Sequence, residues 1–467
     1  MKLYNTLTRQ KEQLRAEEGS QLHIYTCGLT VYSHPHIGNW VSYIYWDVLV
    51  RSLIDLGYDV NRVQNITDVG HLVSDDDDGE DKMEKGARKE NLTAWDVAEK
   101  YIAIAEKEAY ELLGLLRPNH MPRATDYIKE QIDFVKQLEN NEYTYEIPND
   151  GIYFDTAKFP DYGKLAKLDI EGLEAGKRVN HQGKRNKTDF ALWKFSPRDS
   201  KRDMEWESPW GKGFPGWHLE CSVMARELLG DTIDIHTGGI DHIPVHHTNE
   251  IAQTEALTNQ PLARIWMHNN HLKIDDGKMA KSVGNIVTLS DIIDRGYTPY
   301  DFKTLVLSSH YQTEGNFTWD ILAAAANRLD NYYACADLQH QSFSVDEWLG
   351  KSSIIDDLIA ALSDNLDTPK ALSLLDKFAE EVATKLIAPS EQGVLSEILS
   401  TVDSLLGLDL STRTDITNKQ KEIMAQRESA RSSKDWRTSD AMRDELLQDG
   451  IVVRDTPHGQ VWSRRNR

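Results

Sequence analysis

The segment from residue 21 to residue 67 constrains the fold more than any other part of the sequence. Residues 21–27, QLHIYTC, alternate in the manner of a strand that runs into a loop. From Gly38 onward apolar residues recur on one helical face, and Gly57 is a suitable end for that helix. A second strand is predicted in DVNRVQNIT. Strand, loop, helix and strand in this order predict a parallel α/β sheet, in which ligands bind at the carboxyl ends of the strands. The expected helical face consists of Val41, Ile44, Tyr45, Val48 and Leu49.

The chain of 467 residues is long enough for two to four domains. Residues 115–205 are rich in turns and predict an irregular insertion, after which the sheet pattern resumes at TIDIHTGGIDHI. Beyond residue 316 the pattern is helical, and STRTDITNKQ predicts a linker before a small final unit. We therefore expect domains at 1–315, 316–410 and 411–467. The helical part has a predicted buried stripe at Ile354, Leu358, Leu362 and Leu366.

Composition limits the class of protein. No apolar run reaches the roughly 20 residues of a membrane span, and the first residues lack the apolar stretch of a signal peptide, so a cytoplasmic protein is expected. Three cysteines far apart do not form a disulfide framework. The net charge of −22 argues against nucleic-acid binding through bulk charge, although residues 419–467 carry 11 Lys/Arg against 8 Asp/Glu. The acidic run at 75–81 is better explained as a solvated loop than as a calcium site.

The loop HPHIGN places His36 and Asn39 where the first helix begins. Backbone N–H groups point outward at a helix N-terminus, and this arrangement suits a phosphate. A helix-capping asparagine and a turn glycine would produce the same pattern, so the loop alone does not establish an anion site.

The segment GKMAKSVGN carries Lys278 and Lys281 three residues apart between glycines. Lysine is a compact cation suited to phosphate. An exposed basic loop without chemistry is the alternative.

Three further residues have the chemistry of metal ligands. His246 and Glu250 are four apart, so on a helix they share a face, whereas His247 would point elsewhere. Such pairs are usually surface contacts, and Cys221 alone would more often be a buried apolar thiol. Each of these features has a simple alternative explanation when it is taken alone. Few single explanations other than a functional site account for all of them together: two phosphate-type loops, two isolated thiols and a His–Glu pair.

The same residues carry a resemblance to a known family. HIGN and KMAKS resemble the two signatures, usually HIGH and KMSKS, of class I aminoacyl-tRNA synthetases. TCGLTVY, NITD, PGWHLECS, GGIDHIPVHHTNEIAQ and WMHNNHLKIDDGKMAKSVGN resemble other blocks of the cysteinyl-tRNA synthetases. The segment ARSSKDWRTSDAMRDELLQDGIVVRDTPHGQVW resembles their C-terminal region. The resemblance implies a Rossmann-like catalytic domain with a connective insertion, then an α-helical bundle and a small anticodon-binding region.

The resemblance also implies roles for individual residues. Cys27, Cys221, His246 and Glu250 match the zinc ligands of the family, and Glu250 is expected to be the most weakly held. His36 and Asn39 would face ATP, Lys278 and Lys281 would close over pyrophosphate, and Gly239 and Asp241 would line the adenosine side. Thr67 and Trp217 match positions of the amino-acid pocket. Asn39 replaces a histidine and Ala280 a serine of the usual signatures; since asparagine still donates hydrogen bonds, we expect an altered rate rather than lost activity.

The implied reaction joins cysteine and ATP into cysteinyl-adenylate and then transfers cysteine to tRNA(Cys). Mg²⁺ would accompany ATP, and Zn²⁺ would distinguish the cysteine thiol from the serine hydroxyl. The chain is expected to be a monomer. Trp436, Arg437 and Trp462 are candidates for contact with anticodon bases.

Two alternatives remain at this point. A related ligase uses the same adenylate to join cysteine to an amino sugar, but the tail of this chain argues against it. The other alternative is a catalytically silent zinc- or RNA-binding protein, in which the lysines and the His36 loop would have been free to decay.

Overall fold

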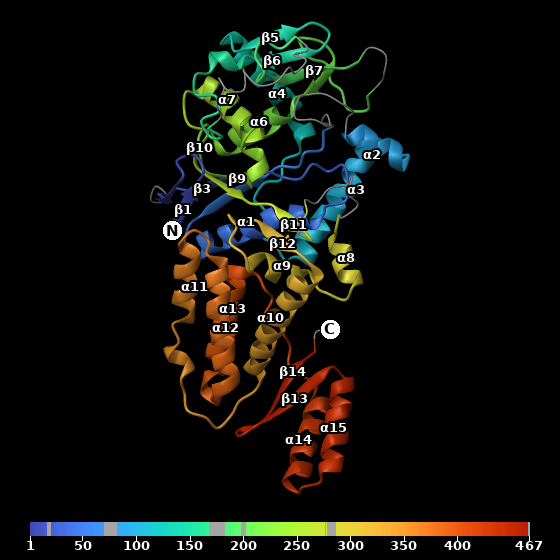
Figure 1. Cartoon of the computed structure of the whole chain (residues 1–467), viewed down its shortest axis with the longest axis vertical. Coiled ribbons are helices and arrows are strands. Elements are labelled where there is room, and N and C mark those ends of the chain that lie inside the picture. Colours follow the sequence, from blue (N-terminus) through green and yellow to red (C-terminus); the bar gives the residue numbers. More distant parts are fainter. Residues whose placement is uncertain are drawn as a thin grey trace.

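The computed structural model describes residues 1–15, 20–69, 82–167, 183–197, 202–275, 277 and 286–465. The molecule is elongated, with the parallel sheet and the insertion at one end and the C-terminal unit at the other (Figure 1). The predicted acidic loop at 75–81 and the predicted basic loop at 278–282 lie outside the described residues. No helix of the described chain is long and apolar enough to cross a membrane.

The centre of the upper half is a parallel four-stranded sheet in the order β10-β9-β3-β4. Its strands are Ala263–Asn269 (β10), Ile233–Gly239 (β9), Leu22–Thr26 (β3) and Val60–Gln64 (β4). The predicted strand, helix and strand are therefore confirmed, with α1 (Ile37–Asp55) as the crossover. In the register, Ile24 lies opposite both Ile235 and Arg62. The buried apolar side chains of these strands, Leu22 and Ile24 among them, form the core under the site.

Helix α1 is buried over most of its surface, beyond the predicted face. Trp40, Tyr43 and Trp46 are also buried, because α1 packs between the sheet and the helices below it (Figure 1). The helix ends at Asp55, and Gly57 has a φ of +85°, as predicted for a helix terminator.

The insertion is not irregular, so that interpretation is wrong. It contains α4 (Ile128–Asn140) and an antiparallel sheet in the order β5-β6-β7-β8. The strands are Thr144–Ile147, Gly151–Phe154, Phe190–Phe195 and Gly213–Pro215, so the sheet continues past residue 205. The strands are short and a register shift lies between Ile152 and Tyr153, which obscures the period-two pattern that reveals a strand.

The remaining elements of the upper half connect the sheet to the insertion and to the helices. They are β1 (Lys2–Asn5), β2 (Gln10–Gln13), α2 (Lys82–Glu90), α3 (Ala94–Glu106), the π-helical turn Lys107–Leu112, α6 (Trp217–Leu229), α7 (His246–Thr258), β11 (Leu272–Ile274), α8 (Leu289–Asp294), α9 (Pro299–Leu307) and β12 (Gly315–Phe317).

The lower half is helical, as predicted. It consists of α10 (Trp319–Asp337), α11 (Ile354–Ser363), α12 (Thr368–Lys385) and α13 (Gln392–Leu406). The predicted stripe is buried, although Leu366 follows the end of α11. The final unit contains α14 (Asn418–Ser432), α15 (Trp436–Gln448), β13 (Ile451–Thr456) and β14 (Gly459–Arg464).

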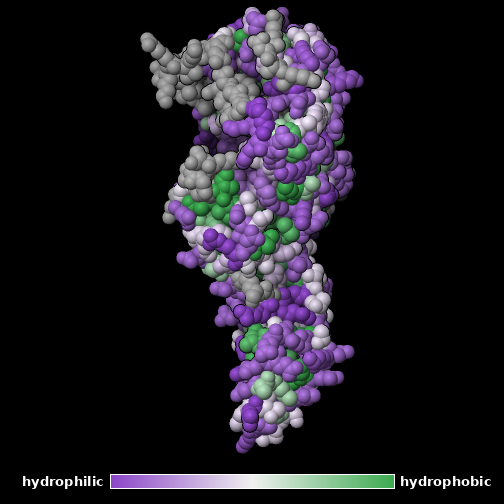
Figure 2. Space-filling model, turned by 90° about the vertical axis from the view of Figure 1, so that its right-hand side faces the viewer, coloured by the Kyte–Doolittle hydropathy of each residue, from purple (hydrophilic) through white to green (hydrophobic). Residues whose placement is uncertain are grey.

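Buried polar contacts attach the final unit to the C-terminal end of α10 and to the turn that follows it. The side chain of Gln341 donates to the carbonyl of Trp462 at 2.8 Å and accepts from its N–H at 2.9 Å. The guanidinium of Arg413 donates to both carboxylate oxygens of buried Asp337. The segment expected to be a linker is therefore held in place. The face shown in Figure 2 is mainly hydrophilic where the structure describes it, with hydrophobic side chains in small groups.

Candidate active site and metal centre

A cavity of about 530 Å³ lies where the carboxyl ends of β3, β9 and β10 meet the N-terminus of α1. This is the place where open parallel sheets bind ligands. It is lined, among others, by predicted site residues from distant parts of the sequence: Cys27, His36, Asn39, Thr67, Trp217, Cys221, Gly239, Asp241 and His246. Lys278 and Lys281 lie outside the described residues.

The four predicted metal ligands converge at the base of this cavity. Cys27 follows β3, Cys221 lies on α6, and His246 and Glu250 lie on α7; all four are buried. Their ligand atoms lie within 4.8 Å of one another. Tetrahedral zinc with bonds of about 2.0–2.3 Å places its ligands roughly 3.5 Å apart, and thiolate, imidazole and carboxylate are its usual donors. The residues therefore fit a zinc ion.

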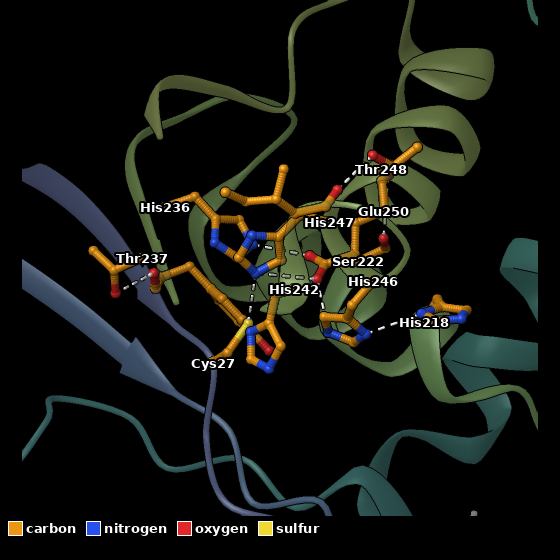
Figure 3. Close-up of polar contacts among 12 residues, drawn as sticks. Cys27, His218, Ser222, His236, Thr237, His242, His246, His247, Thr248 and Glu250 are labelled. Atoms are coloured by element: carbon orange, nitrogen blue, oxygen red, sulfur yellow. Dashed lines mark hydrogen bonds and ion pairs between the residues drawn. The ribbon is translucent and has the colours of Figure 1, made fainter. Parts of the chain in front are cut away.

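Two further histidines extend the cluster, and sequence reasoning missed both roles. His247 does not point elsewhere: its Nε2 lies 3.2 Å from Cys27 Sγ. His236, on β9, has its Nε2 2.9 Å from Glu250 Oε2. With Cys27 and Glu250 these histidines form a second, overlapping ligand set. Figure 3 shows the imidazoles around Cys27 and Glu250, contributed by the strand and the helix together.

Outer contacts hold the imidazoles in place. His247 Nδ1 lies 2.8 Å from His268 Nε2, and His268 Nδ1 lies 2.8 Å from Thr6 Oγ1. His246 Nδ1 lies 3.0 Å from His218 Nδ1. Histidine ligands of metals usually have such a partner on the second nitrogen.

Burial and mutual charge set the protonation of the cluster. Burial alone would raise the pKa of Glu250, but His236 and His246 outweigh it and hold that pKa well below its usual range. Burial lowers the pKa of His246, but Glu250 and Cys221 reverse this and raise it to about 10. Without a metal, Glu250 and His246 thus form an ion pair, in which Glu250 Oε1 lies 2.8 Å from His246 Nε2.

The two thiols differ in acidity. Burial raises the pKa of Cys27, whereas the hydrogen bond with Cys27 lowers the pKa of Cys221. Metal binding requires thiolates, so binding at this site must release protons.

The loop after Cys27 is pressed against β4. A Cβ on Gly28 would lie 1.5 Å from the carbonyl oxygen of Asn65, so only glycine fits. Thr67 is buried at the same edge, where its Oγ1 accepts from Asn65 Nδ2 at 3.0 Å. The Trp217 ring lies 4.5 Å from the ring of His246. Thr67 and Trp217 therefore border the space directly above the ligand cluster.

The first signature occupies the N-terminus of α1. The backbone N–H of His36 donates to Asn39 Oδ1 at 3.0 Å, so the amide oxygen caps the helix. The Nδ2 of Asn39 has no hydrogen bond among the described residues. Asn39 lines the cavity, where this amide nitrogen can act as a donor. The N–H of Ile37 donates to the carbonyl of Val287 at 2.9 Å. The backbone N–H of Ile37 is one of the helix-terminal donors that were expected to face a phosphate, and it is already hydrogen-bonded within the protein.

Of the residues considered for anticodon contact, Trp436 is 56% exposed at the start of α15. Trp462 is 5% exposed and belongs to the core of the final unit, where its ring stacks on His340. A buried ring is not available to stack on a base, so Trp462 is a structural residue.

Comparison with known proteins defines the class. Residues 13–327 match the family described as tRNA synthetases class I (C) catalytic domain. The methionyl-tRNA synthetase of Mycobacterium tuberculosis bound by methionyl-adenylate shares the fold, with a TM-score of 0.57 at 12% identity over 83% of this chain and 92% of that one. The fold is that of a class I aminoacyl-tRNA synthetase, which confirms the predicted fold class.

Closer relatives give the family. Cysteine–tRNA ligase 1 of Burkholderia lata is 42% identical, covering 98% of this chain and 96% of its own. The cysteine–tRNA ligase of Treponema denticola is 37% identical, covering 99% of both. Residues 413–462 match the cysteinyl-tRNA ligase anticodon binding domain. The chain therefore belongs to the cysteine–tRNA ligase family.

Proposed function

We propose that the chain ligates L-cysteine to tRNA(Cys) through a cysteinyl-adenylate, with zinc selecting the substrate thiol. The observation that carries the zinc part is the convergence of Cys27, Cys221, His246 and Glu250 at the base of the cavity. Membership of the cysteine–tRNA ligase family supports the reaction. The domain division at residues 315 and 410, the cytoplasmic location and the monomeric state are part of the same proposal.

Zinc, when bound, would supply a soft Lewis acid that prefers a thiolate to a neutral hydroxyl. Cysteine and serine differ by one atom, which is too small a difference for a steric pocket. The four residues would hold the ion, and Trp217 and Thr67 would confine the amino acid above it. Glu250 is proposed as the most weakly held ligand, since its other oxygen already accepts from His236.

Adenylate formation needs positioning more than covalent chemistry. The cysteine carboxylate attacks the α-phosphorus of ATP, and pyrophosphate leaves. We assign His36 and the Asn39 amide to the phosphates, and Gly239 and Asp241 to the adenosine side. Lys278 and Lys281 would neutralise the charge that develops on pyrophosphate, together with Mg²⁺. The roles of both lysines rest on the sequence signature alone.

The final unit would bind the anticodon arm. Trp436 offers an exposed ring for stacking, and Arg437 follows it at the start of α15. Residues 419–467, with their excess of basic side chains, would add salt-dependent phosphate contacts. The tRNA would then span the helical half toward the cavity.

The test is charging of unfractionated tRNA with labelled cysteine, with serine as the control. We expect charging with cysteine only. Cysteine-dependent pyrophosphate exchange without charging would favour ligation to a small molecule such as an amino sugar. The absence of both activities would favour a catalytically silent binding protein.

A further inference from the structure

A buried cluster of charged side chains lies about the middle of α1, outside the cavity. Asp47 and Arg51, on α1, and Lys303, on α9, form it. The side chains of Asp47 and Lys303 are fully buried. Arg51 and Lys303 thus share the carboxylate of Asp47, and Asp403 of α13 is a further carboxylate whose charge raises the pKa of Lys303. Burying an ammonium group is costly, and a cluster of this kind therefore requires an explanation.

Asp47 does not need Lys303 as a partner. Its Oδ2 accepts from Arg51 Nε at 2.7 Å, and its Oδ1 accepts from the N–H of Leu116 at 2.7 Å. Lys303 Nζ lies farther away, 3.4 Å from Asp47 Oδ2 and 3.3 Å from the carbonyl oxygen of Leu113. Removal of the lysine would leave a balanced and hydrogen-bonded Asp–Arg pair. A methionine of similar length would fill the same space without the cost of desolvation.

The ammonium group instead lies where separate segments meet. It contacts α1 through Asp47, and through Leu113 it contacts the chain directly after the π-helical turn Lys107–Leu112. A Cβ on Gly407, just after α13, would come within 2.7 Å of Lys303 Nζ. Arg51 adds hydrogen bonds to the carbonyl oxygens of Gly114 and Asp403. Figure 1 shows α9 directly below α1 and beside the helical half.

The two helices that meet at Lys303, α1 and α9, are each connected along the chain to a proposed catalytic loop. The N-terminus of α1 carries His36 and Asn39. Helix α9 follows α8 and the second signature, and Ile37 donates directly to Val287 after that signature. A shift of α9 relative to α1 would therefore displace Val287 from Ile37, at the helix end that carries the first signature. A misplacement of about 1 Å can cost roughly 100-fold in rate.

We propose that Lys303 is a positioning residue that fixes α9, and with it the segment of Val287 before α8, against the helix that carries the first signature. The proposal rests on the proposed function. Burial lowers the pKa of Lys303 to about 8 even though Asp47 raises it, which is consistent with a cation kept at a cost to stability. Such residues commonly improve function at the expense of stability.

The test is Lys303→Met in the full chain, with Lys136→Met as the matched control. Lys136 pairs with Asp133 at 3.0 Å on the surface of the insertion. Cysteine-dependent pyrophosphate exchange gives kcat and the KM for ATP, and thermal unfolding gives Tm. We expect K303M to lower kcat at least about tenfold while Tm stays equal or rises, and K136M to leave both unchanged.

Other outcomes overturn the proposal. An unchanged kcat in K303M would remove the positioning role, and a parallel fall of kcat and Tm would show a merely structural role. If K303M does not fold, Lys303→Gln, which keeps a donor for the Leu113 carbonyl, is measured in the same way and judged by the same criteria. No exchange in the wild-type chain would overturn the proposed function and this inference together.

Discussion

Replacing His236 by phenylalanine should weaken zinc binding without unfolding the protein. His236 Nε2 donates to Glu250 Oε2 at 2.9 Å, and neither side chain is exposed. The His236 ring also stacks on Trp266, with ring centroids 4.4 Å apart. Phenylalanine keeps a ring for this stacking but offers no donor. The carboxylate of Glu250 would then lose the contact that fixes its orientation toward the other ligands.

The size of the effect follows from that contact. A hydrogen bond to a charged group contributes about 1.5–3 kcal/mol, which corresponds to roughly 10- to 150-fold in an equilibrium constant. Removal of an outer partner of a metal ligand typically costs 10- to 100-fold in affinity. We therefore expect the Kd for zinc to rise about 10- to 100-fold, measured by competition with a chromophoric chelator.

The conservative variant His236→Gln distinguishes the effect of the hydrogen-bond donor from the effect of the stacked ring. Glutamine keeps an N–H for Glu250 but loses the stacking on Trp266, so its zinc affinity should fall less than that of H236F. Equal affinity of H236F and the wild type would refute the reasoning. So would a larger loss in H236Q than in H236F.

Further expectations concern other parts of the molecule. Lys281→Ala should lower cysteine-dependent pyrophosphate exchange by orders of magnitude; an unchanged exchange rate would remove Lys281 from the mechanism. A strong chelator should lower Tm, since zinc at 100 times its Kd stabilises the fold by about 2.7 kcal/mol, and a Tm insensitive to metal would contradict the zinc assignment. Gly28→Ala should destabilise the fold by about 3 kcal/mol or more in chemical denaturation, because its Cβ would meet the Asn65 carbonyl at 1.5 Å. The pKa of Lys303 is lowered to about 8 in the fold. The unfolded chain therefore binds more protons between about pH 8 and pH 10.4, and Lys303 should make stability rise with pH across that range. The stability difference between wild type and K303M should follow this slope, and a difference independent of pH would contradict it.

Local patterns in the sequence predicted strands β3, β4 and β9 and the first crossover, whereas β10 was not predicted. The alternation in β3, the recurring apolar residues of α1 and the terminating Gly57 are short-range features, and each is visible within about 20 residues. The insertion could not be read in this way. Its strands are three to six residues long, and β6 pairs with β7 although more than 30 residues of chain separate them. Pairing over that distance leaves no local periodicity.

For the candidate site, the sequence was enough to predict which residues are metal-ligand types. It was not enough to predict which other side chains contact them. Cys27 and Cys221 stand out as isolated thiols, and the i,i+4 spacing of His246 and Glu250 predicts a shared helical face. His236 carries no such signal, because it is one alternating residue of a buried strand. Its contact with Glu250 arises only when α7 packs against β9. The prediction that His247 points elsewhere is wrong because it was made for α7 alone. It did not include the packing of α7 against the loop that carries Cys27.

The sequence by itself therefore determined the class of fold, the family and the types of residue that supply the chemistry, since these depend on local order and short motifs. Only the tertiary structure decided which side chains share the metal cluster, that Trp462 is buried, and that Lys303 lies against α1. The reason is physical: burial and the meeting of charges depend on packing between elements that are far apart in the chain.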